Sequence, residues 1–407
     1  MIDLRAARHD RDGLRAAVAR KGAGGAFDEL LAADERWRAL VPRVDELRGA
    51  QKLSGKPTPE QIEELKRVKE ELQALDAELA KAESARDALL QQVPNPPHES
   101  VPDGDTEDDA EEVRRWGEPP RLEHPKDHLE LGRFDMERAA KVSGARFGYW
   151  VGDTALLALA LYRFALDRLV ARGFTPVLPP VLVREEAMYG TGFFPSEKTD
   201  YYEIPADGLY LVGTSEVPLA GLHMGEILEE LPLRYCAFSS CFRREAGAAG
   251  KDTRGIFRVH QFDKVEMFSF VPPEDSTEEH ERLLAVEESL FGELELPYRV
   301  VAIAVNDLGA SAAKKYDIEA WLPGQERFRE LTSTSNTTDY QARRLDIRMR
   351  PEGGRPQTLH TLNGTAIAVG RTIIALLENG QREDGSVGMP AALVDYGAPA
   401  ELPPAAA

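Results

Sequence analysis

Apolar side chains recur at alternating intervals of three and four residues along the segment 27–93. The repeat covers residues 30–47 and returns in residues 72–93, with polar and charged positions between. This spacing is typical of the seam of a coiled coil and predicts two long helices. The two halves are nearly equal and a short connection separates them, which favours an antiparallel helical hairpin within one chain. A coiled coil that joins two chains is the alternative interpretation.

The ends of these helices carry signals of their own. Glycine and proline in the segment 54–57 predict the turn of the hairpin, and Thr58 with Gln61 predicts a capping box on the second helix. Pro42 is expected to kink the first helix, because proline removes a backbone donor. An arm of about 35 residues at about 1.5 Å per residue spans roughly 50 Å.

The pattern changes after the hairpin. The proline-rich residues 94–97 end the second helix, and the acidic segment 101–120 is interpreted as a solvated linker. Within residues 121–407, strand patterns outnumber helical ones and do not alternate with them. This order predicts an α+β fold on a mainly antiparallel sheet. The remaining residues, 1–100, form a separate helical domain in this interpretation.

A proline-rich strand and several helices are predicted inside the second domain. The strand 174–183 contains three prolines, which sheets tolerate at an edge and not in the centre. We therefore expect it at the margin of the sheet or at a subunit boundary. The predicted helices cover residues 156–171, 215–229, 277–291, 308–315 and 366–380.

Composition narrows the possible functions. The formal net charge of −20 argues against general nucleic-acid binding, which needs a cationic surface, but a partner can still dock on a local basic patch. No apolar run approaches the roughly 18 residues of a membrane span. Cysteine occurs only at Cys236 and Cys241, which suits a reducing cytoplasm. Their spacing matches no common zinc pattern, so no zinc is expected.

Basic residues of the first domain mark places where a phosphate backbone could dock. Residues 1–25 carry six arginines and lysines against three aspartates. A docking face and an ordinary solvated helix are equally compatible with this segment. In the hairpin, acidic residues outnumber basic ones, so contacts with nucleic acid would use one edge and the tip. The candidates there are Arg36, Arg43, Arg48, Lys52 and Lys56.

The stretch 239–270 places charged residues where a buried strand pair would carry apolar ones. Residues two apart share a face of a strand, so Arg243 and Glu245 point the same way. Cations, carboxylates and an aromatic ring are costly to bury without a ligand, and they suit a polyphosphate, a flat base and an ammonium group. A solvated hairpin with salt bridges is the alternative. The residues expected on one face of the return arm are Arg258, His260, Phe262, Lys264 and Glu266.

Three further segments, 211–216, 330–344 and 362–371, also place polar groups in an apolar frame. Taken singly, each fits a helix cap, a surface carboxylate or an ion pair. Together with the central stretch they indicate one polar site. The chain lacks a Gly-x-x-x-x-Gly-Lys-Ser/Thr loop and a Gly-x-Gly-x-x-Gly motif, so a nucleotide would need another cradle.

These segments resemble the signatures of a known enzyme family. FRREAGAAGKDTRG and HQFDKVEMF look like the second signature of class II aminoacyl-tRNA synthetases, specifically that of bacterial-type seryl-tRNA synthetases. LVGTSEVPL, TSTSNTTDYQARR and TLNGTAIAVGRTIIALLENGQ resemble other segments of that family. The strand 174–183 resembles the first class II signature, which lies at the dimer interface, and the hairpin 27–93 resembles the family's tRNA-binding arm.

The resemblance implies a two-step reaction. Serine and ATP would give seryl-adenylate and pyrophosphate, and the terminal ribose of tRNA(Ser) would then attack the activated carbonyl. tRNA(Sec) would be a further substrate in a host that has one, and the enzyme would be a homodimer with Mg²⁺. One alternative is a paralogue that transfers the activated amino acid to a carrier protein or small metabolite. Another is a non-catalytic coiled-coil adaptor.

The resemblance also implies which residues act. ATP would be bound by Arg243, Arg244, Glu245, Arg258, Val259, Phe262, Glu330, Leu331, Thr332, Ser333 and Arg371. Serine would be bound by Thr214, Ser215, Glu216, Arg243, Glu266, Asn363 and Thr365. Arg243, Glu245 and Arg371 would be catalytic, and Glu330 with Ser333 would hold Mg²⁺. Strict alternation puts Glu330 and Ser333 on opposite faces of a strand, so this pair requires a bulge or a loop.

Overall fold

The computed structural model describes residues 1–51, 58–247, 250, 252 and 254–404. They form two compact units, Met1–Glu99 and Ser100–Ala407. The predicted turn at 54–57 and the candidate contacts Lys52 and Lys56 lie outside the described residues. Among the helices of the described ranges, none combines the length and the apolar character that crossing a membrane requires.

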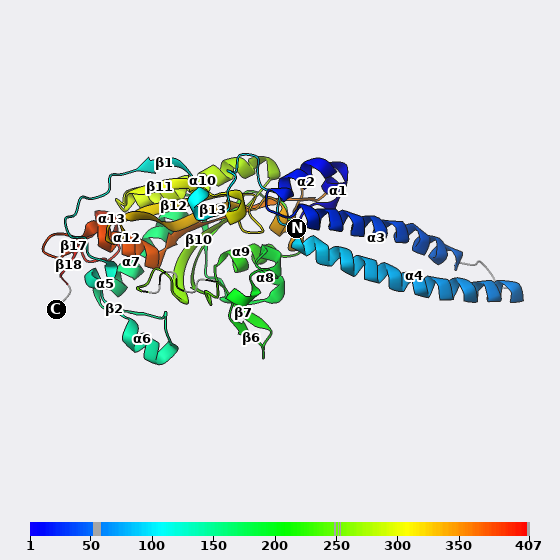
Figure 1. Ribbon diagram of the computed structural model, residues 1–407, viewed down its shortest axis with the longest axis horizontal. Coiled ribbons are helices and arrows are strands. Elements are labelled where there is room, and N and C mark those ends of the chain that lie inside the picture. The colour runs from blue at the N-terminus through cyan, green and yellow to red at the C-terminus, as the bar shows by residue number, and fades with distance from the viewer. Residues whose placement is uncertain (52–57, 248–249, 251, 253, 405–407) are drawn as a thin grey trace. The chain divides into compact units, whose positions relative to one another are not determined.

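The first unit is helical. Its described residues form α1 (Leu4–His9), α2 (Arg11–Ala19), α3 (Gly24–Ala50) and α4 (Pro59–Gln92). α3 and α4 run side by side in opposite directions (Figure 1), which confirms the predicted hairpin. The predicted seam positions Leu40, Val44, Leu72 and Leu75 are buried together.

Local signals in the hairpin act largely as predicted. The Thr58 hydroxyl accepts from the Gln61 backbone N–H at 3.3 Å, and the Gln61 side-chain oxygen accepts from the Thr58 N–H at 2.8 Å, which confirms the capping box. Pro42 lies inside α3 without ending it. At one seam position Arg86 places its guanidinium 4.1 Å from the Trp37 ring centre, so a cation–π contact replaces apolar packing there.

The second unit is built on an eight-stranded sheet. Neighbouring strands are antiparallel except for β4 and β9, which confirms the predicted α+β class. The proline-rich β4 lies at the edge of the sheet, as predicted. The spatial order is β1 (Glu111–Trp116), β11 (Tyr298–Ala302), β12 (Lys314–Leu322), β13 (Arg327–Asn336), β16 (His360–Ala368), β10 (Gln261–Val271), β9 (Leu233–Phe242) and β4 (Thr175–Val177).

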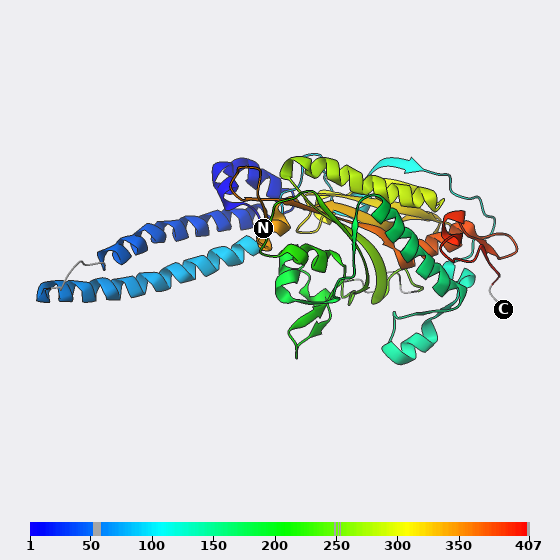
Figure 2. The same ribbon diagram turned by 180° about the vertical axis from the view of Figure 1, so that it is seen from behind.

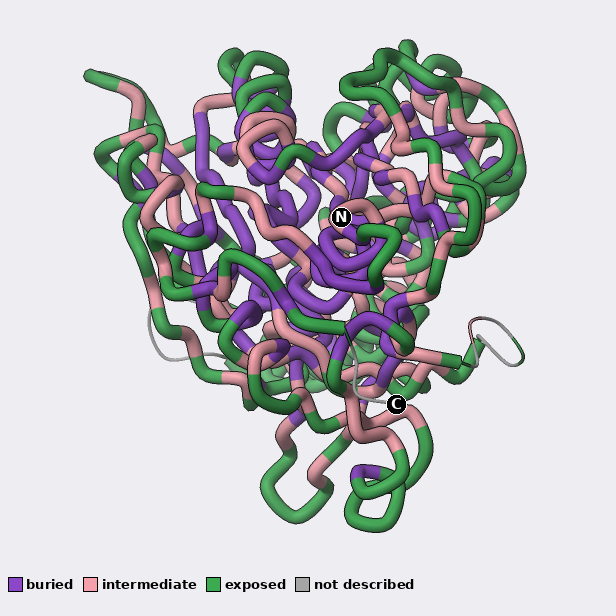
Figure 3. The backbone as a smooth tube through the Cα atoms, turned by 90° about the vertical axis from the view of Figure 1, so that its left-hand side faces the viewer, coloured by how far each residue is buried: buried purple, intermediate pink, exposed green. Residues whose placement is uncertain are grey.

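One face of this sheet is covered by helices. α7 (Asp153–Ala171), α10 (Ser276–Glu293) and α12 (Val369–Gly380) share a hydrophobic core with the inward side chains of the central strands, among them Val265 and Met267. In Figure 2 the yellow-green α10 lies across the front of the sheet. Figure 3 shows the buried residues gathered along the central segments, with exposed residues along the outer loops. On the opposite face Phe268 and Phe270 pack in a second hydrophobic cluster, so a binding site can form only on the rest of that face.

Shorter elements complete the second unit. The helices are α5 (His128–Leu131), α6 (Met136–Ser143), α8 (Glu185–Thr191), α9 (Glu216–Ala220), α11 (Tyr340–Arg344) and α13 (Ala391–Val394). The strands are β2 (Phe134–Asp135), β3 (Tyr149–Trp150), β5 (Leu182–Arg184), β6 (Glu203–Ile204), β7 (Leu209–Leu211), β8 (Ile227–Leu228), β14 (Arg348–Met349), β15 (Gln357–Thr358), β17 (Val387–Gly388) and β18 (Glu401–Leu402).

The linker prediction for 101–120 is wrong in its second half, because β1 pairs with β11 as an edge strand of the sheet. Trp116 stacks on Tyr298 with ring centres 5.7 Å apart, and Arg114 bonds to Glu288 at 2.8 Å. Charges along an exposed edge strand hinder pairing with other chains. The same charges made this strand resemble a solvated linker in the sequence.

Two helix predictions also need correction. Residues 308–315 form no helix, and the chain enters β12 at Lys314. The helix predicted at 215–229 is only α9, followed by one 3-10 turn. It stops because Gly225 adopts a positive φ of 78°, which continues no helix, and the chain then forms β8.

Candidate active site

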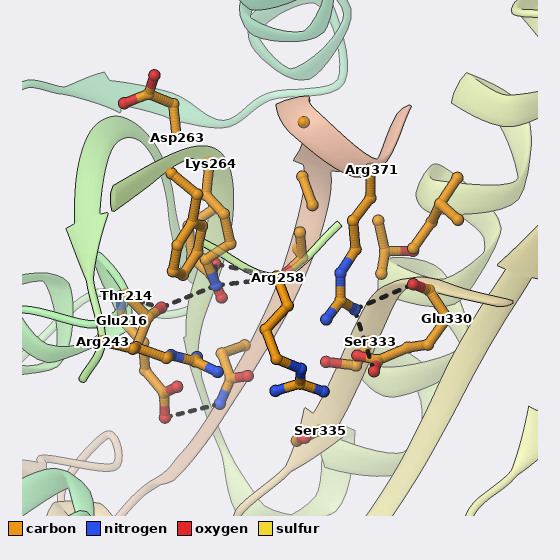
Figure 4. Close-up of a pocket in the computed structure, with 18 of the residues that line it drawn as sticks. Thr214, Glu216, Arg243, Arg258, Asp263, Lys264, Glu330, Ser333, Ser335 and Arg371 are labelled. Atoms are coloured by element: carbon orange, nitrogen blue, oxygen red, sulfur yellow. Dashed lines mark hydrogen bonds and ion pairs between the residues drawn. The ribbon is translucent and has the colours of Figure 1, made fainter. Parts of the chain in front are cut away.

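A cavity of about 350 Å³ opens on the sheet face opposite the helices. It unites the four polar segments singled out in the sequence: the end of β7 with the start of α9, the β9–β10 hairpin, β13, and β16 with the start of α12. Figure 4 shows Arg243, Arg258 and Arg371 directed into this space. Most of the predicted site residues line it: Thr214, Glu216, Arg243, Glu245, Arg258, Val259, Phe262, Glu266, Glu330, Leu331, Thr332, Ser333, Asn363, Thr365 and Arg371.

Two predicted residues lie outside this lining. Ser215 is fully buried beneath it. The Arg244 guanidinium lies 5.6 Å from the Tyr202 ring centre, and the Arg244 backbone N–H donates to the carbonyl of Asp200 at 2.7 Å. Arg244 follows Arg243 in the sequence and turns away from the cavity, so adjacency along the chain does not bring both guanidinium groups to one ligand.

The predicted alternation of the return arm holds only inside the strand. Phe262, Lys264 and Glu266 share the cavity face of β10, as predicted. Arg258 and His260 precede the strand, which begins at Gln261, so their expected alternation with it is wrong. Arg258 still reaches the cavity. His260 does not line it, and its Nδ1 lies 3.0 Å from the carbonyl oxygen of Arg243.

The first arm of the hairpin departs from the strand pattern in the same way. β9 ends at Phe242, and Glu245 has a positive φ of 53°. Arg243 and Glu245 both line the cavity, but the turn of the backbone directs them and strand alternation does not. Gly213 allows this close packing, because a β-carbon at this position would lie 2.9 Å from the Tyr201 ring and 3.2 Å from the Arg243 side chain.

Buried polar groups form the inner end of the cavity. The Lys264 ammonium donates to the hydroxyls of Thr214 at 2.9 Å and Thr365 at 3.1 Å, and it forms an ion pair with Glu266. Thr365 also donates to Glu266 at 3.4 Å. Sequence reasoning placed Lys264 on the correct face but assigned it no role, because its partners come from three other segments of the chain.

Glu216 is the second carboxylate of the inner end. One of its oxygens accepts from the side-chain amides of Gln341 at 2.7 Å and Asn363 at 3.0 Å. Burial, with the nearby negative charge of Glu266, raises the pKa of Glu216 to about 7. Gln341 was missed as a site residue, since a single glutamine at the start of a short helix carries no spacing signal.

Arg243 lies between the two ends of the cavity. Its guanidinium carbon is 5.5 Å from the centre of the Phe262 ring. Its Nε is buried and has no hydrogen-bond partner among the described residues. A buried donor without a partner is costly, so this group is suited to an anionic ligand.

Partly exposed charged pairs form the outer end. Arg258 Nη1 donates to the Glu245 carboxylate at 2.5 Å. Arg371 Nη1 donates to the backbone carbonyl of Glu330 at 3.0 Å and forms an ion pair with the Glu330 carboxylate at 3.1 Å. Burial alone would raise the pKa of Glu330, but the positive charges of Arg371 and Lys315 hold it at about 2. The Glu330 carboxylate is therefore ionised at neutral pH.

A β-bulge brings Glu330 and Ser333 to the same cavity. Ile318 of β12 pairs with Thr332, and the next residue pairs with Glu330, so Leu331 is the extra residue of β13. The extra residue shifts the alternation by one position. The irregularity that the sequence required for this pair is thus confirmed, and both side chains line the cavity.

Comparison with known proteins identifies the family. Residues 1–97 match the "Seryl-tRNA synthetase N-terminal domain", and residues 201–380 match the "tRNA synthetase class II core domain (G, H, P, S and T)". The serine–tRNA ligase of Thermobifida fusca is 52% identical over 409 residues, which cover 97% of this chain and 96% of that protein.

Solved structures agree with this match. The seryl-tRNA synthetase of Pyrococcus horikoshii, crystallised with ATP, superposes with a TM-score of 0.94 at 42% identity over 100% of both chains. The cytoplasmic serine–tRNA ligase of Naegleria fowleri, solved with AMP, gives a TM-score of 0.87 at 34% identity over 95% of this chain and 94% of that one. This chain therefore belongs to the seryl-tRNA synthetase family of class II aminoacyl-tRNA synthetases and is an ATP-dependent ligase.

Proposed function

We propose that the cavity activates L-serine with ATP and transfers it to tRNA(Ser). In the first step an oxygen of the serine carboxylate attacks the α-phosphorus of ATP, the α–β phosphoanhydride bond breaks, and pyrophosphate leaves. In the second step the terminal ribose hydroxyl of the tRNA attacks the activated carbonyl, and AMP leaves. Neither step needs a protein nucleophile, so positioning and charge neutralisation carry the catalysis.

One observation carries this proposal: a polar pocket for a small amino acid and a set of arginines for a polyphosphate open into one cavity. Arg243 lies between these two parts of the cavity, and its buried Nε–H donor has no hydrogen-bond partner within the described part of the chain. A forked guanidinium there can hold the serine carboxylate and the α-phosphate together, which aligns the attacking oxygen with the phosphorus. We assign this role to Arg243.

The inner end would bind serine through Thr214, Glu216, Glu266, Asn363 and Thr365. The carboxylates of Glu216 and Glu266 suit the substrate ammonium, and Glu266 can also accept from the substrate hydroxyl. Alanine would leave that acceptor unpaired in a buried site, which discriminates more strongly than a change in size. This accounts for selection of serine over alanine.

The outer end would bind ATP. Phe262 offers a ring face for adenine, the Val259 backbone lies beside it, and Glu245 can accept from the adenine amino group. Arg258 and Arg371 would hold the outer phosphates. Because Arg258 now bonds to Glu245, these two assignments require that pair to separate when ATP binds.

Glu330 and Ser333 fit a magnesium site at the phosphates. Mg²⁺ prefers oxygen ligands, and a carboxylate with a low pKa and a hydroxyl reach the same cavity through the β13 bulge. The ion would neutralise phosphate charge during activation. Leu331 and Thr332 belong to the same bulge, are almost fully buried, and fix the shape of this wall.

The helical unit is the proposed tRNA-binding domain, with Arg36, Arg43 and Arg48 of α3 as candidate contacts. Its arm would recognise the shape of tRNA(Ser), since duplex RNA is recognised mainly through its backbone and minor groove. tRNA(Sec) would be charged as well where the host has it. We also propose that the enzyme acts in the cytoplasm, where translation takes place.

A homodimer is the proposed assembly. Leu178, next to the edge strand β4, is 84% exposed, and Leu159 on α7 is 61% exposed. Large apolar side chains so exposed favour a partner surface. A second copy of the chain is the expected partner, and sedimentation velocity of the full chain would measure this assembly directly.

A tRNA-charging assay tests the proposed function. The wild-type chain should show serine-dependent exchange of pyrophosphate into ATP and should attach serine to tRNA(Ser). A variant with residues 45–79 replaced by a short glycine–serine turn keeps Phe27, Leu30 and Leu90 at the base of the hairpin. It should retain exchange and lose charging. Exchange without charging in the wild type would instead support the paralogue that uses another acceptor.

A further inference from the structure

Lys264 is a buried cation inside the pocket proposed for an amino acid. Lys264 is only 8% exposed, and its ammonium contacts three side chains of the same pocket: Thr214, Thr365 and Glu266. A lysine is rarely buried to this extent unless its charge is paired. Its partners come from the segment before α9 and from β16 and β10, so it joins three parts of the serine site.

Hydrogen bonding by Lys264 decides how the threonine hydroxyls are oriented. The Thr214 oxygen accepts from Lys264 at 2.9 Å and from the Glu216 backbone N–H at 3.2 Å. A hydroxyl oxygen has two acceptor positions and one hydrogen. Both acceptor positions are filled, so Thr214 is left as a donor toward the cavity. Thr365 likewise accepts from Lys264 and turns its hydrogen to Glu266.

Lys264 also sets the charge of the pocket. Glu216 and Glu266 are the carboxylates that line the inner end, and one lysine offsets one of them. A third carboxyl, Glu287 of α10, lies behind Gly364 and is fully buried. Burial raises the pKa of Glu287 well above its usual range. Because Lys264 pairs with Glu266, Glu216 is the carboxylate left to receive the substrate ammonium.

Resting on the function proposed above, we propose that Lys264 is a positioning and specificity residue for the amino acid. Its ammonium turns the Thr214 hydroxyl toward the substrate and occupies one side of Glu266. Glu266 is left able to accept from a neutral hydroxyl while the pocket resists a second cation. A side chain that carries an amine would meet Lys264 at close range and be rejected.

The alternative is a structural role, in which Lys264 only neutralises buried carboxylates and thereby stabilises the fold. The two roles predict different outcomes. A structural lysine affects stability and affects both substrates alike. A specificity lysine changes the use of serine and the ranking of amino acids, and leaves the affinity for ATP nearly unchanged.

The experiment measures amino-acid-dependent pyrophosphate exchange by the full-length protein. Lys264→Met is expected to raise the KM for serine by roughly 100-fold and to change the KM for ATP by less than about threefold. The preference for serine over 2,3-diaminopropionate, which carries an amine in place of the hydroxyl, should fall by at least about tenfold. Lys264→Arg keeps the charge and should retain that preference.

Two controls separate the outcomes. Lys314→Met removes a partly buried lysine of β12 that lies over the Tyr316 ring and outside the cavity lining, and it should leave both KM values unchanged. Lys264→Ala should regain part of its serine use on addition of ethylammonium and none with tetramethylammonium, which cannot donate hydrogen bonds. If Lys264→Met does not fold, Lys264→Ala with ethylammonium gives the same answer.

The inference is overturned if Lys264→Met keeps the serine KM and the amino-acid ranking of the wild type. It is also overturned if the KM values for serine and ATP rise by the same factor. Failure of the proposed function has a different signature, because the wild-type protein itself would then show no serine-dependent exchange.

Discussion

The two ends of the cavity are built differently. At the inner end Glu216, Lys264 and Glu266 are at most 8% exposed, and each bonds to other polar side chains of the protein. At the outer end the Glu330 side chain is 43% exposed and that of Arg258 is 25% exposed. Charge is thus enclosed at one end and partly accessible to water at the other.

This difference indicates how each end selects its ligand. A buried network with little freedom penalises any ligand that leaves one of its groups unpaired, which suits a choice between similar small amino acids. Partly exposed charges can exchange partners at small cost, which suits the many charges of ATP. Substitutions at the inner end should therefore affect the amino acid strongly, and those at the outer end should affect ATP more mildly.

Arg243 belongs to both ends, so its loss should have the largest effect. Arg243→Ala is expected to lower serine-dependent pyrophosphate exchange by about a thousandfold or more, because it removes the proposed donor between the serine carboxylate and the α-phosphate. Arg244→Ala, whose guanidinium faces Tyr202, should lose no more than about tenfold. Comparable losses in the two variants would contradict the central position of Arg243.

Glu266→Gln tests the inner end alone. The amide keeps the shape of the carboxylate and removes its charge, so the KM for serine should rise by roughly 100-fold. The KM for ATP should change by less than about threefold, because the outer end is untouched. Steady-state exchange kinetics at varied serine and varied ATP measure both values. Equal losses for the two substrates would mean that Glu266 does not select the amino acid.

The predictable parts of the molecule depend on local periodicity. The seam of α3 and α4 and the cavity face of β10 from Phe262 to Glu266 follow from spacing along one element, and both are confirmed. The resemblance to a family also identified residues that spacing alone does not indicate, such as Arg371. The periodic positions of the seam and of β10 have in common that their neighbours in the sequence determine them.

The unpredicted parts depend on partners far along the chain. β1 resembled a linker because its pairing strand β11 lies almost 200 residues later. Gln341 reaches Glu216 across 125 positions. His260 leaves the expected face because the strand begins one residue after it. No spacing rule within one segment contains these contacts, since they form only when the sheet is assembled.

The pH dependence of the inner end follows from Glu216. Burial raises its pKa from an ordinary value of 4.5 to about 7, so the folded protein holds a proton that the unfolded chain releases. Folding stability should therefore fall as pH rises between about 4.5 and 7, and Glu216→Gln should lack this dependence. Chemical denaturation of both proteins at several pH values measures it. A parallel pH dependence in the two proteins would contradict the assignment.

Serine use should change in the opposite direction over the same range. In the proposed binding mode the substrate ammonium contacts the ionised carboxylate, so kcat/KM for serine should fall about tenfold per pH unit below pH 7. Glu216→Gln should have a lower kcat/KM for serine, and this value should not fall further as the pH drops below 7. The KM for ATP serves as an internal control, because it should show no transition assigned to Glu216.

Ser333→Ala should give the smallest effect and tests the outer end. The hydroxyl is one of two proposed protein ligands of Mg²⁺, and water can replace it at an open site, so the Mg²⁺ concentration for half-maximal exchange should rise only about three- to tenfold. The KM for serine should stay unchanged. Ser335→Ala on the same strand is the matched variant, since Ser335 also lines the cavity but is no proposed ligand. A larger effect of Ser335→Ala than of Ser333→Ala would contradict the role of the β13 bulge in directing Ser333 to the metal ion.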